Sequence, residues 1–583
     1  MSKSRTKTKQ SRAKTKQVDP ATLAVIWGWL QQITNEMDEV VCLSAFSPTI
    51  SEGYDRASGI YTKTGRMVVQ GKTSLPIFIL TMQDAVEVII EAFKGKFSPD
   101  DIILYNDPYR GGTHLMDVKV FKPFFRHGKL AYWLGSSGHW PDVGGAAPGG
   151  FVPGANEIFQ EGLRFPPLKI YEKGRLNEGL LALILANVRI SEERYGDLQA
   201  QIGSLRVGEE RLNALLDKYG DDTLDFYARE MMQRSEQHMR SYIKEIPDGT
   251  YSATEWMDND GISDDPVKIA LDIVIEGDRM AFDFSQSSPP VRGSVNAGIS
   301  VAKSGVYTFL MHTFSDIPIN SGIFNPTKFI FSKQTFLNAS HPKPVSGAAA
   351  EVTQRMYDVC SLALNKVLPK RIPANPFGTI NNTGIGGVDS EGKNYIMYVF
   401  TGGGYGAYDE GDGFPYGAPP VGTSRVQPYE VFEHLYPVRT RRFSLREKSG
   451  GIGKYRGGLG AVIEIELLEE EATVGFMGDR VRFGPQGAQG GGEGAKNDVY
   501  IVRKNGKIER LPLGAKGGTI IRKGDVISIH TPGGGGYGFP AERDRELILR
   551  DIVNEVITRE DAERDYRIGP LGEEELRAIR GKM

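Results

Sequence analysis

Apolar residues recur every three or four positions along residues 19–40, and this spacing predicts an amphipathic helix. Leu23, Ile26 and Met37 follow the spacing, and Pro20 stands where proline is favoured at a helix start. Similar patterns predict a set of further helices along the chain. They cover residues 82–93, 187–220, 223–246, 301–313, 348–368 and 541–556, with a short helix from Arg559.

Apolar and polar residues alternate in several short runs, as in half-buried strands. Residues 60–69 and 269–284 each hold two such runs around a polar turn, and both segments predict β-hairpins. An apolar run at residues 102–105 predicts a strand that leads directly into Asp107. From Tyr251 onward short strands dominate. The pattern therefore predicts an α+β fold with mixed helices, mostly antiparallel sheets, and a β-rich and glycine-rich C-terminal half.

Composition narrows the class of protein. Of the 583 residues, 40% are hydrophobic and 25% are charged, as in soluble globular proteins. With only Cys42 and Cys360, a disulfide framework and a cysteine-based zinc site are both excluded, and a reducing cytoplasm fits. No apolar run approaches the roughly 20 residues that a membrane helix needs. We therefore expect a cytoplasmic protein.

The first residues differ from the rest in charge. Residues 1–17 hold seven lysines and arginines and no acid. An arm that binds nucleic acid is one interpretation. The remaining chain is net acidic and shows no basic stripe, so we favour a disordered, solvated tail over residues 1–18.

Glycine is abundant, with 71 residues, and it clusters at residues 402–404 and 531–538. Backbone N–H groups in such a cluster could bind an anion. A tight bend after a strand is the alternative that we favour. The chain has neither a P-loop nor a dinucleotide-binding glycine motif between a strand and a helix, so phosphate binding by this chain is only weakly supported.

Residues 106–145 contain three of the eight histidines, set among aspartates and glycine-rich turns. His114 and Asp117 are three positions apart, and a predicted hairpin returns through Leu130–Leu134 to a glycine–serine loop that carries His139. Loops at one rim of a hairpin lie side by side, so these side chains can share a metal. Imidazole with carboxylate favours Zn²⁺, Mn²⁺ or Fe²⁺ over Ca²⁺ or Mg²⁺. The alternative is that these residues only make hydrogen bonds, since no HExxH signature is present.

Two further aspartates in this stretch, Asp107 and Asp142, are candidates for a catalytic role. They could orient a ligand or act as a general base toward water. A serine-hydrolase triad of Ser136 or Ser137 with His139 and Asp142 is disfavoured, because no nucleophile elbow accompanies these residues.

Several blocks of the chain resemble the hydantoinase B/oxoprolinase family. They are residues 106–145, the upstream stretch SPTISEGYDRASGIYTKTGRMVVQ at 47–70, the EGLR-PP run at 161–167, the block at 436–466, and TPGGGGYG at 531–538. The resemblance covers nearly everything after residue 18. It implies one divalent metal (Zn, Mn or Fe) held by Asp55, His114, Asp117 and His139. It also implies ATP bound by a separate, hydantoinase A-like subunit.

The resemblance implies three hypotheses for function. The first is the metal-binding subunit of a two-component, ATP-dependent hydrolase of cyclic amides such as hydantoins, oxoproline or lactams. In it, Asp107 or Asp142 would orient or deprotonate water. The second is the metal subunit of an ATP-dependent ketone carboxylase of the acetone type. The third is a non-catalytic scaffold subunit that shapes the partner's active site.

The chain departs from the family pattern at two places, and both bear on the substrate. Arg56-Ala57-Ser58 replaces the Asp-Phe-Ser-Cys of many members, and GAPPVGTSRVQP at 417–428 replaces a His-Met-Thr-Asn-Thr-Arg-Asn run. Neither change touches the four expected ligands. We expect four parts in order: the tail at 1–18, a metal-site α/β region at 19–246, a β-rich region at 247–540, and C-terminal helices at 541–583.

Overall fold

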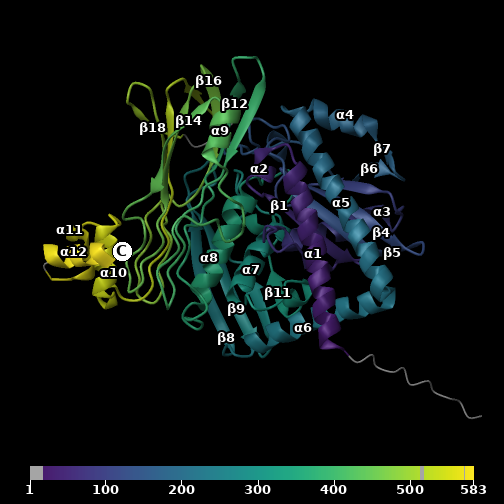
Figure 1. Cartoon of the computed structure of the whole chain (residues 1–583), viewed down its shortest axis with the longest axis horizontal. Coiled ribbons are helices and arrows are strands. Elements are labelled where there is room, and N and C mark those ends of the chain that lie inside the picture. Colours follow the sequence, from purple (N-terminus) through teal and green to yellow (C-terminus); the bar gives the residue numbers. More distant parts are fainter. Residues whose placement is uncertain (1–17, 512–517, 570–571, 583) are drawn as a thin grey trace, which may run out of the picture.

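The computed structural model describes residues 18–511, 518–569 and 572–582. The predicted basic tail therefore lies outside the described residues, apart from Val18. The described chain forms helices and four mostly antiparallel sheets, which confirms the predicted α+β class (Figure 1). No described helix is both long enough and apolar enough to cross a bilayer.

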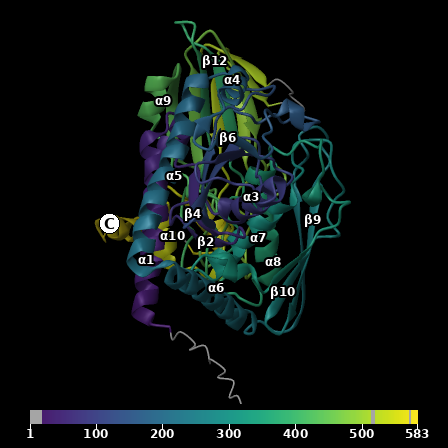
Figure 2. The same ribbon diagram turned by 90° about the vertical axis from the view of Figure 1, so that its right-hand side faces the viewer.

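The N-terminal part of the chain forms a seven-stranded sheet with the strand order β2-β1-β5-β4-β3-β6-β7. Helices α1 (Pro20–Ser44) and α5 (Ser191–Tyr219) run side by side over one face of it (Figures 1 and 2). Helix α3 (Phe78–Phe93) packs on the other face. The strands are β1 (Arg56–Thr62), β2 (Met67–Gln70), β3 (Ile102–Tyr105), β4 (Asp117–Arg126), β5 (Lys129–His139), β6 (Leu168–Glu172) and β7 (Arg175–Leu176).

The two faces of this sheet belong to different hydrophobic clusters, as alternating side chains require. Tyr61 and Trp133 pack with α3, whereas their neighbours Ile60 and Leu134 pack with α1 and α5. The sheet is therefore covered on both faces. The short strands β2 (MVVQ) and β3 (IILY) are accordingly almost entirely apolar.

One sequence expectation for this sheet was wrong. The segment Gly135–Gly138 was expected as a loop, but it continues β5 and pairs with β1 on one side and β4 on the other. Glycine is required there by close packing: a Cβ on Gly135 would lie 2.7 Å from the Phe121 ring. His139 thus ends a strand in the middle of a sheet, which fixes its backbone firmly.

The middle of the chain adds a second sheet and two buried helices. Strands β8 (Gly249–Met257), β9 (Val267–Glu276), β10 (Arg279–Asp283) and β11 (Thr327–Ile330) form it, with β10 and β11 parallel. The core helices are α7 (Ile299–Thr313) and α8 (Thr353–Leu364), and α8 follows a π-helical turn at Ala348–Val352. Residues of α3, α7 and α8 belong to one hydrophobic cluster, so packing is continuous across residue 246. The expected domain boundary at this residue stays a prediction.

Two more sheets form the β-rich C-terminal part. One has the order β13-β12-β16-β19 and the other β14-β15-β20-β17-β18. Their strands are β12 (Asn382–Val388), β13 (Asn394–Val399), β14 (Val438–Leu445), β15 (Ala461–Leu467), β16 (Glu471–Met477), β17 (Asp498–Val502), β18 (Ile508–Arg510), β19 (Thr519–Arg522) and β20 (Val526–His530). The remaining helices are α2 (Pro48–Ser51), α4 (Glu178–Ala186), α6 (Asp221–Ile243), α9 (Tyr429–Leu435), α10 (Arg545–Val553), α11 (Arg559–Tyr566) and α12 (Glu573–Lys582).

Extended glycine-rich segments lie between these sheets and the C-terminal helices, where they run side by side (Figure 1). We call residues 402–417, 449–460, 484–494 and 531–538 the glycine-rich loops. The last of them donates backbone hydrogen bonds to two others, from Gly534 to Gly458 at 2.9 Å and from Gly536 to Gly492 at 2.9 Å. It also accepts one from Gly404, at 3.1 Å through Pro532. The N–H groups here serve other backbone segments, which agrees with the structural interpretation of the glycine clusters.

Candidate metal centre

The four expected metal ligands meet at one edge of the seven-stranded sheet because three neighbouring strands begin or end there. Asp55 directly precedes β1, Asp117 is the first residue of β4, and His139 is the last of β5. Asp117 is the register partner of His139, and the backbone N–H of His139 donates to the carbonyl of Asp55 at 3.0 Å. His114 lies on the turn that leads into β4. Residues 84 positions apart are thereby brought together by strand pairing.

The functional atoms of this group are close to one another. His139 Nδ1 lies 3.2 Å from Asp117 Oδ1 and 3.9 Å from Asp55 Oδ2. His114 Nδ1 lies 3.4 Å from Asp117 Oδ2, and the two imidazole rings are 5.0 Å apart at their centroids. One ligand atom each from His114, Asp117 and His139 falls within 4.8 Å of the others. All four side chains are buried.

Burial and neighbouring charges shift the pKa values of these four side chains. Burial raises the pKa of Asp55 to about 7, although His139 opposes the shift. Burial lowers the pKa of His114 to about 3, so this imidazole is in the neutral form that binds metals. Burial would raise the pKa of Asp117, but His114 and His139 outweigh it and lower this pKa to about 2. For His139 the nearby carboxylates outweigh burial and raise the pKa.

These residues fit a divalent metal by two independent observations. First, His114 Nδ1 is buried without a hydrogen-bond partner, which is costly for a polar atom unless a ligand satisfies it. Second, two ligand atoms each about 2.1 Å from a tetrahedral ion lie roughly 3.4 Å apart. The separations of 3.4 Å and 3.2 Å between each imidazole and Asp117 are close to that value. The mixed nitrogen and oxygen donors suit Zn²⁺, Mn²⁺ or Fe²⁺.

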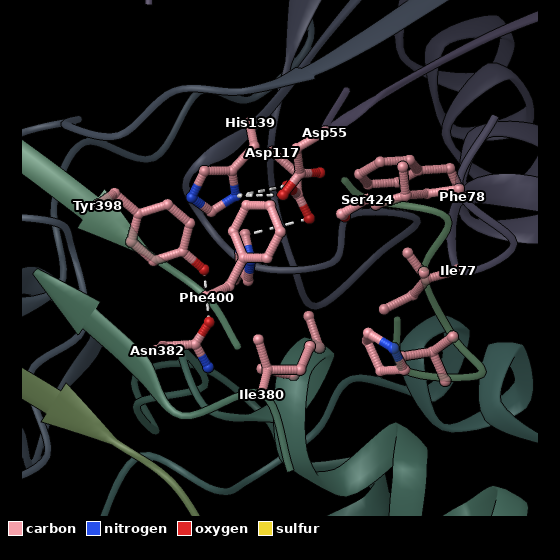
Figure 3. A pocket seen from close by; sticks show the side chains of 17 residues that line it. Asp55, Ile77, Phe78, Asp117, His139, Ile380, Asn382, Tyr398, Phe400 and Ser424 are labelled. Carbon is pink, nitrogen blue, oxygen red and sulfur yellow. Dashed lines mark hydrogen bonds and ion pairs between the residues drawn. The ribbon is translucent and has the colours of Figure 1, made fainter. Parts of the chain in front are cut away.

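Residues outside the expected set hold the ligands in place. The Thr113 hydroxyl donates to Asp117, and Lys119 Nζ in turn lies 3.3 Å from Thr113 Oγ1. The Tyr398 ring stacks on His139, with centroids 4.9 Å apart and planes 17° apart. Its hydroxyl donates to Asn382 Oδ1 at 2.5 Å (Figure 3). Sequence reasoning missed all of these, and only the position of Thr113 next to His114 was a usable signal.

A small cavity of about 50 Å³ adjoins the group, room for a few water molecules. Asp55, His114, Asp117 and His139 line one side of it. The remaining walls are mostly apolar and come from distant parts of the chain (Figure 3): Leu75, Ile77, Phe78, Ala349, Ala350, Ile380, Asn382, Tyr398, Phe400, Pro419, Val421, Gly422 and Ser424. The metal ligands thus face a confined, largely apolar space.

Residues 417–428, where the sequence is expected to depart from the family pattern, supply one wall of this cavity. Val421 accepts a hydrogen bond from the backbone of Ile77 at 3.1 Å, and Arg425 donates from its backbone to Gly53 at 2.9 Å. The Arg425 guanidinium lies 4.1 Å from the ring centre of Tyr54, the residue before Asp55. We call residues 417–428 the covering segment. The covering segment therefore borders the space that the expected metal ligands face.

Arg56, the other departure, points away from the cavity. Its guanidinium donates to Cys42 Sγ at 3.2 Å and to the carbonyl of Thr73 at 2.7 Å, and it lies 3.5 Å from Asp38. Asp38 and Cys42 are buried residues of α1, and Thr73 lies on the turn that follows β2. The contacts of Arg56 thus support the chain next to Asp55 and do not form the cavity wall.

The two predicted catalytic aspartates are engaged elsewhere. Asp107 accepts from the backbone of Tyr109 at 3.0 Å and lies 3.4 Å from Arg164. Asp142 is fully buried and accepts from Arg189, at 2.7 Å from its guanidinium. Neither residue lines the cavity. A role as general base stays a prediction for both, without support from these contacts.

Comparison with known proteins agrees with this geometry. The family model described as hydantoinase B/oxoprolinase matches residues 19–540. The caprolactamase subunit beta of Pseudomonas jessenii is 32% identical over 567 residues, covering 94% of this chain and 96% of that protein. The crystal structure of the ATP-dependent caprolactamase from Pseudomonas jessenii superposes with a TM-score of 0.88 at 30% identity, over 97% of this chain and 100% of the other.

A more distant solved structure shares the fold. It is the nucleotide-free structure of an acetone carboxylase, with a TM-score of 0.85 at 20% identity, covering 97% of this chain and 83% of that one. The match of the family model over most of the chain, together with the 32% identity to the caprolactamase subunit, is decisive. The chain belongs to the hydantoinase B/oxoprolinase family.

Proposed function

We propose that this chain is the metal-binding subunit of a two-component, ATP-dependent hydrolase of cyclic amides. The observation that carries the proposal is the convergence of His114, Asp117 and His139, with Asp55 beside them, on one buried cavity. The similarity to a caprolactamase subunit beta over nearly the full length of both chains supports the substrate class and the existence of a partner. The partner would be a hydantoinase A-like subunit that binds ATP.

The proposed division of the reaction between the two subunits follows from the chemistry of amides. An unstrained cyclic amide resists attack by water, and transfer of a phosphoryl group to its oxygen in the partner subunit would give a far better electrophile. A divalent metal held by Asp55, His114, Asp117 and His139 would supply water of lowered pKa near neutral pH. The cavity walls would then hold the ring and exclude other water.

The protein's own residues have identifiable tasks in this scheme. The apolar walls from Phe78, Ile380 and Phe400 match the hydrocarbon part of a lactam or hydantoin ring. Tyr398 keeps the imidazole plane of His139 fixed by stacking, and Asn382 fixes Tyr398. At about 50 Å³ the cavity is smaller than such a ring, so its walls, the covering segment among them, would have to move apart for the substrate to enter.

The test is reconstitution. We expect the chain, co-purified with its ATP-binding partner, to contain about one equivalent of transition metal and to hydrolyse a lactam or hydantoin with concomitant ATP hydrolysis. Parallel reactions with a ketone, with and without bicarbonate, test the carboxylase alternative. ATP turnover that requires both ketone and bicarbonate would replace the hydrolase assignment. A complex that is fully active without metal would reduce this chain to a scaffold.

A further inference from the structure

Tyr54, the residue before Asp55, has an unusual backbone conformation. Its φ angle is 59°, in the left-handed region that bulky side chains rarely adopt. The chain turns here from α2 into β1, and the Tyr54 N–H donates to the carbonyl of Ile50 at 3.2 Å. Such a conformation persists only where the surrounding structure holds it, and residues of this kind gather at functional sites. The groups that hold Tyr54 therefore also fix the start of β1, where Asp55 lies.

Two guanidinium groups lie against the Tyr54 ring. Arg425 of the covering segment is 4.1 Å from the ring centre, and Arg56 is 5.3 Å from it. A cation within about 6 Å of the centre of an aromatic ring is attracted to the face of that ring. Arg56 is fully buried, whereas Arg425 is exposed. The Tyr54 ring therefore connects a side chain fixed in the interior to one that the covering segment carries.

The covering segment also holds Gly53, on the other side of Tyr54. The backbone N–H of Arg425 donates to the carbonyl of Gly53 at 2.9 Å. Gly53 has no room for a side chain, because a Cβ there would lie 2.6 Å from the carbonyl oxygen of Thr49 and 3.2 Å from the side-chain nitrogen of Gln427, another residue of the covering segment. Gly53 and Tyr54 are thus both held by one segment far along the chain.

Asp55 depends on this turn for the direction of its side chain. Within the described residues its carboxylate accepts no hydrogen bond, and Oδ2 lies 3.9 Å from His139 Nδ1. Its carbonyl is tied to the N–H of His139 at 3.0 Å, so the sheet side of Asp55 is fixed and the remaining freedom lies in the turn before it. His114, Asp117 and His139 form a compact group of possible ligands without Asp55. The fourth expected ligand is therefore the one placed by its neighbours.

We propose that Tyr54 is a positioning residue that links the covering segment to Asp55. While Arg425 lies on its ring, Tyr54 holds Asp55 beside the other expected ligands, and displacement of the covering segment removes this hold. Neither Tyr54 nor Arg425 lines the metal cavity, so both act through Asp55. The inference rests on the metal centre of the proposed function and adds that the four-residue site is complete only when the covering segment is in place.

The test measures metal affinity instead of turnover. The purified, metal-free chain is titrated with Zn²⁺ in competition with a chromophoric chelator. Tyr54→Asn removes the ring and keeps a residue that tolerates the left-handed conformation, and it should weaken Zn²⁺ binding on the order of tenfold. Tyr54→Phe, which keeps the ring, should bind Zn²⁺ as the wild type does. Equal affinities in these two variants would overturn the proposal, because the turn alone would then suffice.

Arg425→Met tests the link to the covering segment. It removes the cation and keeps an unbranched side chain, and it should weaken Zn²⁺ binding about two- to fivefold. The double variant with Tyr54→Asn should bind no more weakly than Tyr54→Asn alone, because both changes remove one contact. Arg206→Met, at an exposed position in α5, is the matched control and should bind as the wild type does. Additive losses in the double variant would overturn the link.

The absorption spectrum of the Co²⁺-loaded chain adds a readout that a change in stability alone would not move, because it reports the ligand set. The spectrum of Tyr54→Asn should differ from that of the wild type and resemble that of Asp55→Ala, whereas Tyr54→Phe should restore the wild-type spectrum. A wild-type chain that binds no metal would overturn the proposed metal centre and this inference with it. Metal binding that Tyr54→Asn leaves unchanged would overturn this inference alone.

Discussion

The seven-stranded sheet and the glycine-rich loops fix their backbones by opposite means. In the sheet, side chains pack on both faces, and paired strands deliver Asp55, Asp117 and His139 to one edge. In the glycine-rich loops the chains approach so closely that no side chain fits between them. A Cβ on Gly534, for example, would lie 1.9 Å from the carbonyl oxygen of Tyr405. The backbone of the sheet is thus held by the packing of its side chains, whereas the backbone of the glycine-rich loops requires positions that have no side chain.

This difference decides which substitutions each region tolerates. In the sheet, chemistry resides in a few side chains, and their removal should leave the fold intact while function is lost. In the glycine-rich loops, adding a single methyl group should disturb the fold while every functional group remains. Four substitutions test this contrast, from the largest expected effect to the smallest.

The first substitution is His114→Ala. It removes one ligand without disturbing a strand, so turnover of the reconstituted complex should be abolished and the metal content of the purified chain should fall, while the circular dichroism spectrum stays unchanged. His434→Ala, at an exposed position in α9, is the control and should behave as wild type. Full activity in His114→Ala would refute the metal centre.

The second is Gly534→Ala, compared with Gly28→Ala. The new methyl group at 534 clashes with backbone, so the midpoint of urea denaturation should fall, by on the order of 3 kcal/mol in stability. Gly28 lies at an exposed position inside α1 with nothing within 4 Å, and alanine there should stabilise by up to about 1 kcal/mol. If both variants unfold at the wild-type midpoint, the loops shift freely and the contrast between the regions is wrong.

The third is Val421→Ala in the covering segment. Because Val421 lines the metal cavity, losing two methyl groups should change the ratio of kcat/KM for seven-membered over five-membered lactams by about tenfold, in favour of the larger ring. Val426→Ala, in the same segment but 46% exposed and outside the cavity lining, should leave the ratio unchanged. Metal content should be unaffected in both. Identical selectivity in the two variants would show that this segment does not contact the substrate.

The fourth is Glu161→Gln, which changes a buried side chain that accepts hydrogen bonds from the backbone. Glu161 is fully buried and accepts from the backbone of Val345 at 2.9 Å and Ser346 at 2.9 Å. Burial raises its pKa from 4.5 to about 7, so between these values the folded protein binds more protons than the unfolded chain. Its contribution to stability is therefore greatest at low pH and is lost as the pH rises toward 7.

Denaturation midpoints at several pH values between 4.5 and 7 check this. The wild type should lose more stability across the interval than Glu161→Gln, whose amide does not titrate. Parallel curves for the two proteins would contradict the assignment of a raised pKa to Glu161.

The sequence predicted those helices and strands in which hydrophobic residues recur at a regular spacing. The helix expected over residues 19–40 is α1, and the hairpin expected over 60–69 is β1 and β2. The expected metal ligands His114, Asp117 and His139 do meet, because their motif sits on adjacent strands. The resemblance added Asp55, which spacing alone would not have joined to them.

Other features gave no local signal. The Gly135–Gly138 strand was mistaken for a loop because glycine marks loops far more often than the interior of a crowded sheet. Helix α4 was not foreseen within the stretch before residue 187. Tyr398 and Val421 reach the metal cavity from more than 250 residues away from His139, and only the folded chain brings them there.

The covering segment supplies one wall of a cavity whose expected metal ligands all come from the other end of the chain, and it touches that end through backbone hydrogen bonds, the contacts of Thr423 and Arg425, and the packing of Val421 in the hydrophobic cluster that contains Phe78. A change of specificity therefore does not require any change in the reactive groups. The wall can be exchanged by altering about a dozen residues far along the chain, while the metal ligands stay as they are. By the same arrangement, an N-terminal fragment ending before this segment would carry every expected ligand and still leave the site open to solvent on that side.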